Sequence, residues 1–293
     1  MFNFKKAELC DSQRLCDAFK KYRDRVCDYS TGNVLFWRDY YDISFSLDDD
    51  CLILKYGSMG ECECFSYPVS EQPIEKIKEL LKVYGAPLCI SCLTEEQLAL
   101  VKANFKVCDV IHSQDWDDYL YLAKDIVTLG GRRYSGQRNH INKFKRCYAE
   151  YSFEVISREN TDLAKKFCTD YFDNLKKDSP VFATERVKLM ELLDNWDSYL
   201  QRGGLLLVDG QAVGISIGEL MGDTLIVHVE KADTSYDGVY PMLTNCFARE
   251  FATSDECLYI NREEDCGEEG LRTAKMSYHP IEIIKKYGVV ITE

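Results

Sequence analysis

The stretch GLLLVDGQAVGISIGELMGDTLIVHVEK, residues 204–231, decides the fold. It predicts a hairpin over 204–220, because Asp209-Gly210 is a dipeptide that favours two-residue hairpin turns. Met221-Gly222-Asp223 then turns the chain into a third strand over 224–231. A helix over roughly 241–252, a strand over 257–260 and a short helix near 270–277 are expected to follow. This order is typical of a mixed α/β domain.

Two helices precede this stretch in the same half of the chain, and the elements before them predict a second domain of the same kind. Helices are expected over 161–176 and 184–199, the second with an apolar face of Leu189, Leu192, Leu193 and Trp196. Further towards the N-terminus come β-like runs at 41–46, 51–56 and 61–67. A helix over 70–84, with Ser70 as its cap and Gly85 at its end, a strand over 87–93 and a helix capped by Thr94 and Gln97 follow.

The repeated order predicts an α/β (α+β) fold of two tandem acetyltransferase-like domains, in which helices flank mixed sheets. We place the N-terminal domain at 1–125, a basic linker helix at 126–150 and the C-terminal domain, with the expected site, at 151–293. Fold analogy of this kind carries no function by itself.

Composition predicts a cytoplasmic protein. The chain of 293 residues is 46% hydrophobic, and none of its apolar runs approaches the ~18 residues that a membrane helix needs. Fourteen cysteines without a secretion signal indicate free thiols in a reducing compartment. Two cysteine pairs leave a zinc site as the less favoured alternative: Cys62 and Cys64, and Cys89 and Cys92. We expect no metal.

Charge is distributed unevenly. The net charge of −13 argues against a broad nucleic-acid surface. Residues 131–146, however, hold six lysines and arginines and no acid. Arg133 and Arg138 are therefore expected to bind an anion, such as a tRNA acceptor end, a nucleotide or a lipid head group. The alternative is a helix that pairs with the acidic body of the protein.

Four stretches together resemble one family: CDYSTGNVLFW at 27–37, RNHINKFKR at 138–146, HVEKADTSYDGVYPM at 228–242 and YINREEDCGEEGLRTAKMSYHP at 259–280. They are similar to bacterial proteins related to the C-terminal domain of phosphatidylglycerol lysyltransferase. The resemblance implies two tandem acetyltransferase-like domains. It also implies a distant similarity to peptidoglycan transferases that take amino acids from aminoacyl-tRNA.

The strand over 224–231 carries the candidate catalytic residues. Strand alternation would place His228 and Glu230 on one face, where they could serve as base and orienting group for an attacking amine. A polar strand face without a catalytic role is the alternative.

Coenzyme A is disfavoured as a cofactor. Acetyltransferases hold its pyrophosphate in a glycine-rich loop that opens a helix. The corresponding segment here, 234–241, has one glycine, Gly238, preceded by Asp237, whose charge would repel a pyrophosphate.

The segment from Asn261 to Tyr278 is the strongest candidate for a substrate site, because mixed charges follow the end of a strand. They could grip a zwitterion such as an amino acid. We predict that Arg262, Glu264, Asp265 and Lys275 line the main cleft, and that Asn261, Arg272 and Tyr278 also bind the substrate. The alternative is a solvated loop joined by its own salt bridges.

Together these patterns predict a transferase that moves an aminoacyl or acyl group to an amine or hydroxyl. Its expected partners are a small molecule or the end of an aminoacyl-tRNA. The alternative is a non-catalytic protein that binds an amino acid or nucleotide in the same cleft. The oligomeric state does not follow from the sequence.

Overall fold

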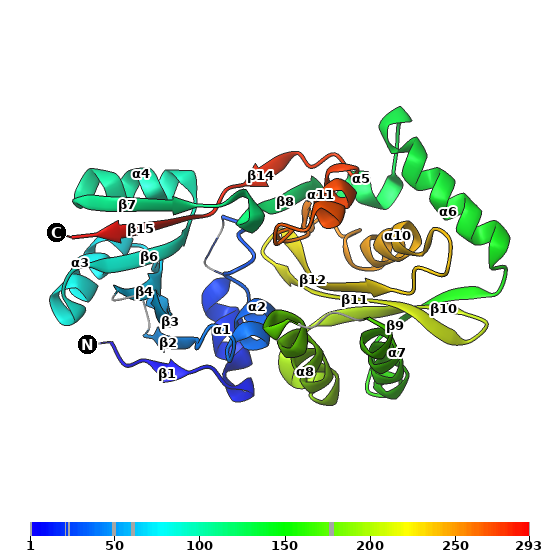
Figure 1. The fold of residues 1–293 in the computed structure, drawn as a ribbon, viewed down its shortest axis with the longest axis horizontal. Helices are drawn as coiled ribbons and strands as arrows, with labels where there is room; N and C mark the ends of the chain where they lie inside the picture. Colours follow the sequence, from blue (N-terminus) through cyan, green and yellow to red (C-terminus); the bar gives the residue numbers. More distant parts are fainter. Residues whose placement is uncertain are drawn as a thin grey trace. The chain divides into compact units, whose positions relative to one another are not determined.

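The structure, a computed structural model, describes residues 2–20, 22, 24–48, 51–59, 62–175 and 179–292 (Figure 1). Glu61, which the sequence places in a strand, lies outside these residues. The chain forms two compact units. Unit 1 comprises 1–118, 264–272 and 283–293, and unit 2 comprises 119–263 and 273–282.

Unit 1 is built on a mixed sheet in the order β1-β2-β3-β4-β6-β15-β7, with β5 paired to β3. Its strands are β1 (Lys5–Lys6), β2 (Ser44–Leu47), β3 (Cys51–Met59), β4 (Cys62–Ser66), β5 (Val69–Ser70), β6 (Leu88–Leu93), β7 (Val107–His112) and β15 (Tyr287–Ile291). Its helices are α1 (Ser12–Phe19), α2 (Thr31–Trp37), α3 (Pro73–Tyr84) and α4 (Glu95–Asn104).

The helix ends of unit 1 test the expected caps. Thr94 and Gln97 form the capping box of α4 as expected. Gly85 ends α3 with φ +79°, a conformation that glycine adopts without strain. The Ser70 cap is wrong, because Ser70 belongs to β5 and α3 begins at Pro73, whose missing N–H is harmless there.

Unit 2 is built on a second mixed sheet in the order β14-β8-β13-β12-β11-β10-β9. Its strands are β8 (Asp118–Leu122), β9 (Tyr151–Val155), β10 (Arg202–Val208), β11 (Gln211–Met221), β12 (Thr224–Ala232), β13 (Tyr259–Asn261) and β14 (Glu282–Ile284). Its helices are α5 (Ala123–Thr128), α6 (Ser135–Cys147), α7 (Thr161–Asn174), α8 (Pro180–Asp194), α9 (Trp196–Tyr199) and α10 (Val239–Phe251). Helix α11 (Glu269–Met276) begins in unit 1 and ends in unit 2.

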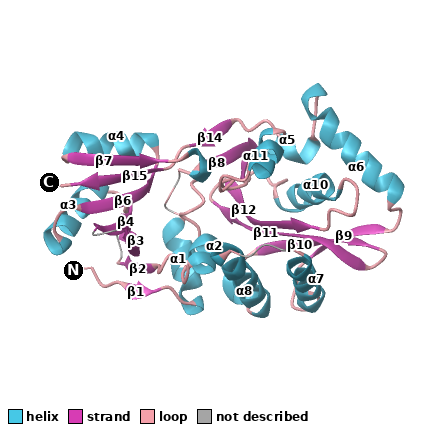
Figure 2. Ribbon diagram, in the orientation of Figure 1, coloured by secondary structure: helices cyan, strands magenta, loops and turns pink. Residues whose placement is uncertain are grey.

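The predicted hairpin is confirmed as β10 and β11, and the third strand as β12. Helix α10 lies on one face of this sheet, and α7 and α8 lie on the other (Figures 1 and 2). The core side chains Leu205, Ile215 and Leu225 are completely buried. Burial of each contributes about 1.5–3 kcal/mol, which accounts for the apolar pattern that made these strands predictable.

Two irregularities of the second sheet position the site. The pairing of β11 with β12 shifts at a β-bulge: Ile217 pairs with Val229 and Gly218 with Val227, so His228 is the additional residue. Strands β12 and β13 pair in parallel only over Thr224–Ile226 and Tyr259–Asn261, and they part beyond that point. Bulges re-aim side chains, and parting parallel strands leave room between them.

The fold class is confirmed: each unit has a mixed sheet flanked by helices, and the repeated element order fits two tandem acetyltransferase-like domains. The two sheets do not divide at residues 125 and 150, because β8 joins the second sheet and β15 the first. The limits 1–125, 126–150 and 151–293, taken as independent folding units, stay a prediction. Among the described residues, no helix is long and apolar enough to cross a membrane.

Candidate functional site

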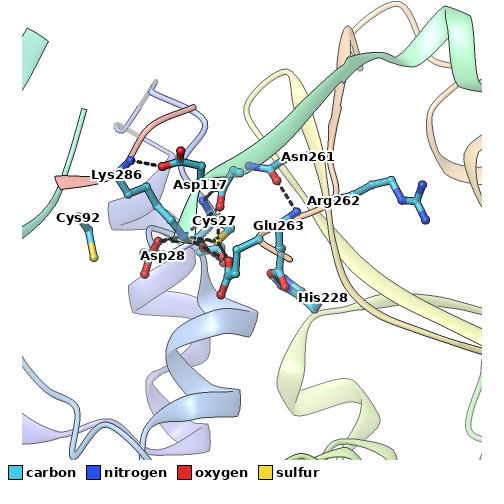
Figure 3. Close-up of polar contacts among 12 residues, drawn as sticks. Cys27, Asp28, Cys92, Asp117, His228, Asn261, Arg262, Glu263 and Lys286 are labelled. Carbon is cyan, nitrogen blue, oxygen red and sulfur yellow. Dashed lines mark hydrogen bonds and ion pairs between the residues drawn. The ribbon is translucent and has the colours of Figure 1, made fainter. Parts of the chain in front are cut away.

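Unit 1 contains a buried ammonium group surrounded by carboxylates. Lys286 Nζ lies 2.8 Å from Asp28, 2.9 Å from Asp118 and 3.3 Å from Glu264, and its side chain is only 8% exposed (Figure 3). Burial alone would lower the pKa of Lys286, but Asp118 and Asp28 outweigh it and raise that pKa well above its usual value. The same ammonium holds the pKa of Asp28 below its ordinary value despite burial. Lys286 and Asp28 are therefore both ionised at neutral pH.

Cys27 completes this cluster. Its backbone N–H donates to Asp118 at 2.8 Å, and its Sγ lies 3.5 Å from Lys286 Nζ. Burial, followed by the charge of Asp118, raises the pKa of the Cys27 thiol well above its usual value, so the thiol stays neutral. Ligand atoms of Cys27, Asp118 and Glu264 are close enough together to share a metal ion. Lys286 Nζ already contacts all three, as a cation built into the chain.

In unit 2, His228 lies between two carboxylates. Its Nε2 is 2.9 Å from Glu219 and its Nδ1 is 2.7 Å from Glu263, and all three side chains are largely buried (Figure 3). Burial alone would lower the pKa of His228, but Glu263 and Glu219 outweigh it and raise the pKa to about 10. His228 is therefore an imidazolium at neutral pH and has no free lone pair, which does not suit a general base.

Glu230 is separated from His228 by the bulge. Glu230 pairs in register with Ser216, whereas Glu219, the partner of His228, lies three residues along β11 and therefore faces the other side of the sheet. The Glu230 carboxylate accepts hydrogen bonds from Arg262 Nη2 and from the Thr244 hydroxyl. The expected shared face is thus absent, because alternation holds only in a strand without a bulge. A catalytic role for either residue stays a prediction.

Of the four predicted cleft residues, Arg262 lines a small cavity together with Glu230 and Thr244. Its guanidinium lies over the Tyr278 ring, with Cζ 4.9 Å from the ring centroid. The structure therefore brings together Arg262 and Tyr278, two residues of the predicted substrate segment. Burial opposes the charge of Arg262, but Glu230 outweighs it and raises its pKa, so it stays a cation.

Asn261 and Lys275 hold the backbone of Arg262 and Glu263 in place. Glu263 has φ +57°, a left-handed conformation that costs a non-glycine residue about 1–2 kcal/mol. Asn261 Oδ1 accepts the Glu263 N–H at 2.6 Å (Figure 3). Lys275 Nζ donates to the Arg262 carbonyl at 2.6 Å and to that of Glu263 at 3.1 Å. These two residues therefore position Glu263 and Arg262.

Two further predicted residues form a pair of their own in unit 1. Asp265, fully buried, accepts two hydrogen bonds from Arg272 at 2.9 Å, and Arg272 also reaches Asp115 at 2.7 Å. These hydrogen bonds from Arg272 fix the turn that opens α11. That Arg262, Glu264, Asp265 and Lys275 line one cleft stays a prediction.

The two predicted anion-binding residues of the basic strip, Arg138 in α6 and Arg133 in the turn before it, have structural partners. Arg138 donates to the carbonyls of Leu129 and Gly131, and Arg133 pairs with Asp125. Ile141 and Phe144 are buried as expected. Besides Arg133 and Lys143, which pair with Asp125 and Asp237, the exposed cations of this region are Arg132, Lys145 and Arg146. Binding of an anion by Arg133 and Arg138 stays a prediction.

The loop before α10 does not fit the pyrophosphate of coenzyme A. Gly238 has φ +81°, and a Cβ at this position would lie 2.3 Å from the His140 carbonyl oxygen of α6. The glycine is therefore needed for the close contact between this loop and α6. Asp237 pairs with Lys143 at 2.8 Å, and its N–H donates to the Tyr148 hydroxyl at 3.1 Å. Poor binding of coenzyme A stays a prediction, now with a geometric reason.

The cysteines do not gather as a zinc site would require. Cys64 and Cys89 face each other across β4 and β6 with their Sγ atoms 3.5 Å apart, whereas Cys92 contacts the Tyr56 hydroxyl. No three of Cys62, Cys64, Cys89 and Cys92, all of them described, bring their sulfur atoms within 4.8 Å of one another.

Residues 19–290 match the family described as "Phosphatidylglycerol lysyltransferase, C-terminal". The chain belongs to this family. One similar solved structure is that of a conserved protein of unknown function from Bacteroides thetaiotaomicron VPI-5482. It is 32% identical in sequence, has a TM-score of 0.90, and the match covers 99% of this chain and 100% of that one. The protein MYCGA3080 of Mycoplasmoides gallisepticum is 27% identical over 223 residues, 74% of this chain and 68% of its own.

A more distant structure shows the fold alone. L-PGS from Bacillus licheniformis has a TM-score of 0.64 at 15% identity, covering 96% of this chain and 92% of that one. The family predicted from the four sequence stretches is confirmed, and so is the two-sheet architecture that accompanies it.

Several residues of the two clusters were not predicted from the sequence: Cys27, Asp28, Asp118, Lys286, Glu219 and Glu263. Only Cys27 and Asp28 carried a signal, since they open the stretch 27–37 that contributes to the family resemblance. Lys286 is 258 residues from Asp28, and no local pattern reports a contact at that separation.

Proposed function

We propose that this protein is an aminoacyltransferase, which moves an aminoacyl group from an aminoacyl-tRNA to an amine or hydroxyl acceptor. Membership of the phosphatidylglycerol lysyltransferase family across both units supports a transferase of this class. The observation that carries the proposal is the group of carboxylates at Lys286 in unit 1.

An aminoacyl group differs from a plain acyl group by its ammonium, and carboxylates are the side chains that recognise ammonium. Asp28, Asp118 and Glu264 already hold one ammonium nitrogen, that of Lys286. Asp118 is fully buried, but the side chains of Asp28 and Glu264 are 25% and 27% exposed. A carboxylate can accept several hydrogen bonds, so the exposed oxygens can receive a second ammonium from solvent.

The exposed cations Arg132, Lys145 and Arg146 of unit 2 support a nucleic-acid donor. They lie on or beside α6, where no acidic residue interrupts the run from 131 to 146. Phosphate contacts of this kind supply affinity without sequence readout and weaken as salt is raised. A single short basic helix suits the end of a tRNA better than a long duplex.

The test is transfer to hydroxylamine, a small nucleophile that stands in for the acceptor. The purified protein is incubated with tRNA charged with labelled amino acids, and labelled aminoacyl hydroxamate is measured. We expect product above the uncatalysed rate, and a KM about tenfold higher for Asp28→Asn, the loss of about 1.4 kcal/mol of binding. Asp17→Asn is the matched control, since Asp17 pairs only with exposed neighbours of α1. Absence of product with every charged tRNA would contradict the proposal.

The second candidate is a protein that binds an amino acid without transferring it. The paired state of His228 favours it, since both ring nitrogens are engaged by carboxylates and leave no free base there. Equilibrium dialysis with labelled amino acids separates the two. Binding of a free amino acid, lost in Asp28→Asn, without hydroxamate formation would favour this candidate.

A further inference from the structure

Three aromatic side chains of unit 1, those of Trp37, Tyr40 and Tyr41, form a cluster at the end of α2. The ring centroid of Trp37 lies 5.9 Å from that of Tyr40 and 6.2 Å from that of Tyr41, and the two tyrosine centroids are 4.8 Å apart. The ring planes are inclined to one another by 56° to 88°, so the rings pack edge against face. Tyr40 is nevertheless 39% exposed and Tyr41 51% exposed. Adjacent exposed rings, unlike scattered ones, are typical of a binding surface.

Helix α2 fixes this aromatic cluster relative to the carboxylates of unit 1. At its start, the Ser30 hydroxyl donates to the Cys27 carbonyl at 2.6 Å, next to the carboxylates. Beyond its end, the Tyr41 N–H donates to the Trp37 carbonyl at 3.0 Å, and the Tyr41 carbonyl accepts the Gly57 N–H of β3 at 2.8 Å. A helix of seven residues is about 10 Å long, which limits the distance between its two ends.

The Tyr41 ring lies close to the two exposed carboxylates of unit 1. Partial burial, followed by the charges of Glu264 and Asp28, raises the pKa of the Tyr41 hydroxyl above its ordinary value. The effect of a charge falls with distance, so both carboxylates are near this side chain. Since the side chains of Glu264 and Asp28 are about a quarter exposed, a ligand from solvent can contact a carboxylate and the aromatic ring together.

The geometry of the aromatic cluster selects the chemistry of its ligand. A cage for a cation needs rings that stand apart, with the cation over their faces. Here the rings touch one another, so only their outer faces are available. The neighbouring carboxylates repel a phosphate. A flat, uncharged nucleobase fits both conditions, because it stacks on the open face of one ring.

We propose that Tyr41 stacks on the adenine of the terminal adenosine of a charged tRNA, with Trp37 and Tyr40 as positioning residues for its ring. The inference rests on the proposed function for the identity of the donor. In an aminoacyl adenosine the ribose and the ester separate the base from the ammonium, so the base can lie on Tyr41 while the ammonium reaches the carboxylates. Every tRNA ends in this adenosine, so the site serves donors with different amino acids.

The test is binding of a stable donor analogue, an aminoacyl adenosine in which an amide replaces the 3′ ester. Equilibrium dialysis compares it with the same compound without its base. We expect the base to improve affinity at least about fivefold in the wild-type protein and in Tyr41→Phe, which keeps the ring, but not in Tyr41→Leu. Trp116→Leu, at a 46% exposed aromatic residue of the same unit, is the matched control and should keep the full effect. Equal affinity for the two compounds in the wild-type protein, or no binding of either, overturns the proposal.

The same variants separate this inference from the proposed function. Binding that depends on the base and on the Tyr41 ring, without hydroxamate formation from any charged tRNA, supports the adenine site while the proposed function fails. Hydroxamate formation with the same KM for charged tRNA in the wild-type protein and in Tyr41→Leu has the opposite meaning. The proposed function then stands and the adenine site is overturned.

Discussion

The two units bury cations in different ways. In unit 1, three carboxylates converge on the single ammonium of Lys286. In unit 2, His228 shares two carboxylates and Arg262 takes one, and the side chains of both clusters there are almost entirely buried. Two carboxylates of unit 1 are about a quarter exposed.

This difference indicates different tasks. A carboxylate-rich cluster that reaches solvent suits recognition of a charged ligand such as an ammonium. The enclosed pairs of unit 2 suit a structural task, because their charges are satisfied by one another away from solvent. From sequence composition alone, the groups of unit 1 and unit 2 could not be told apart, because both are simply clusters of charged residues.

The largest effect is expected from Lys286→Met. It leaves Asp28, Asp118 and Glu264 facing one another without their common ammonium. We expect a loss of about 3–5 kcal/mol in the free energy of unfolding, the usual cost of breaking a buried pair from one side. Urea denaturation measures it. Lys78→Met, at an exposed pair with Glu75 in the same unit, should change it by less than about 1 kcal/mol. Equal losses for both would show that the cluster of unit 1 is no more than a surface network.

Arg262→Met should cost somewhat less, about 3 kcal/mol, because the Thr244 hydroxyl still donates to the single carboxylate of Glu230. The comparison sharpens with the double variant Arg262→Met/Glu230→Leu, which removes both charges. It should recover most of that stability in the same urea experiment, since apolar residues can replace a buried ion pair. A double variant no more stable than the single one would mean that this pair is not enclosed as described.

His228 should make the stability of unit 2 depend on pH. Its pKa of about 10 lies above the ordinary value of 6.5, so its stabilisation is complete below about pH 6.5 and is lost as pH rises towards 10. The difference in urea midpoint between wild type and His228→Gln should therefore be largest near pH 6 and shrink by pH 10. A difference that grows with pH would show that His228 is neutral in the folded protein.

The smallest effect is expected from acetyl-coenzyme A. The glycine of the α10 loop is taken up by contact with α6, and Asp237 is paired with Lys143. Calorimetry should detect no binding at micromolar concentrations. Micromolar affinity would show that the loop rearranges to admit a pyrophosphate.

Local patterns predicted the meander of unit 2, the helices and the family, because periodicity and turn residues are encoded over short stretches. The bulge at His228 could not be predicted, since one additional residue changes every side chain's face without any compositional signal. Asn261, Lys275 and Tyr278 were found as a group, yet their role as clamp and ring support depends on backbone geometry at Glu263. Lys286 was missed because its partners are distant in the chain.

The central claim is that the carboxylates of unit 1 recognise the ammonium of an aminoacyl group. The direct measurement compares transfer to hydroxylamine from one charged tRNA, carrying a neutral side chain, with transfer from the same tRNA after acetylation of the α-amino group. Acetylation removes the charge and leaves the ester. We expect the KM of the acetylated donor to be at least about tenfold higher for wild type and little different for Asp28→Asn. Equal KM values for the two donors in the wild-type protein would contradict the account.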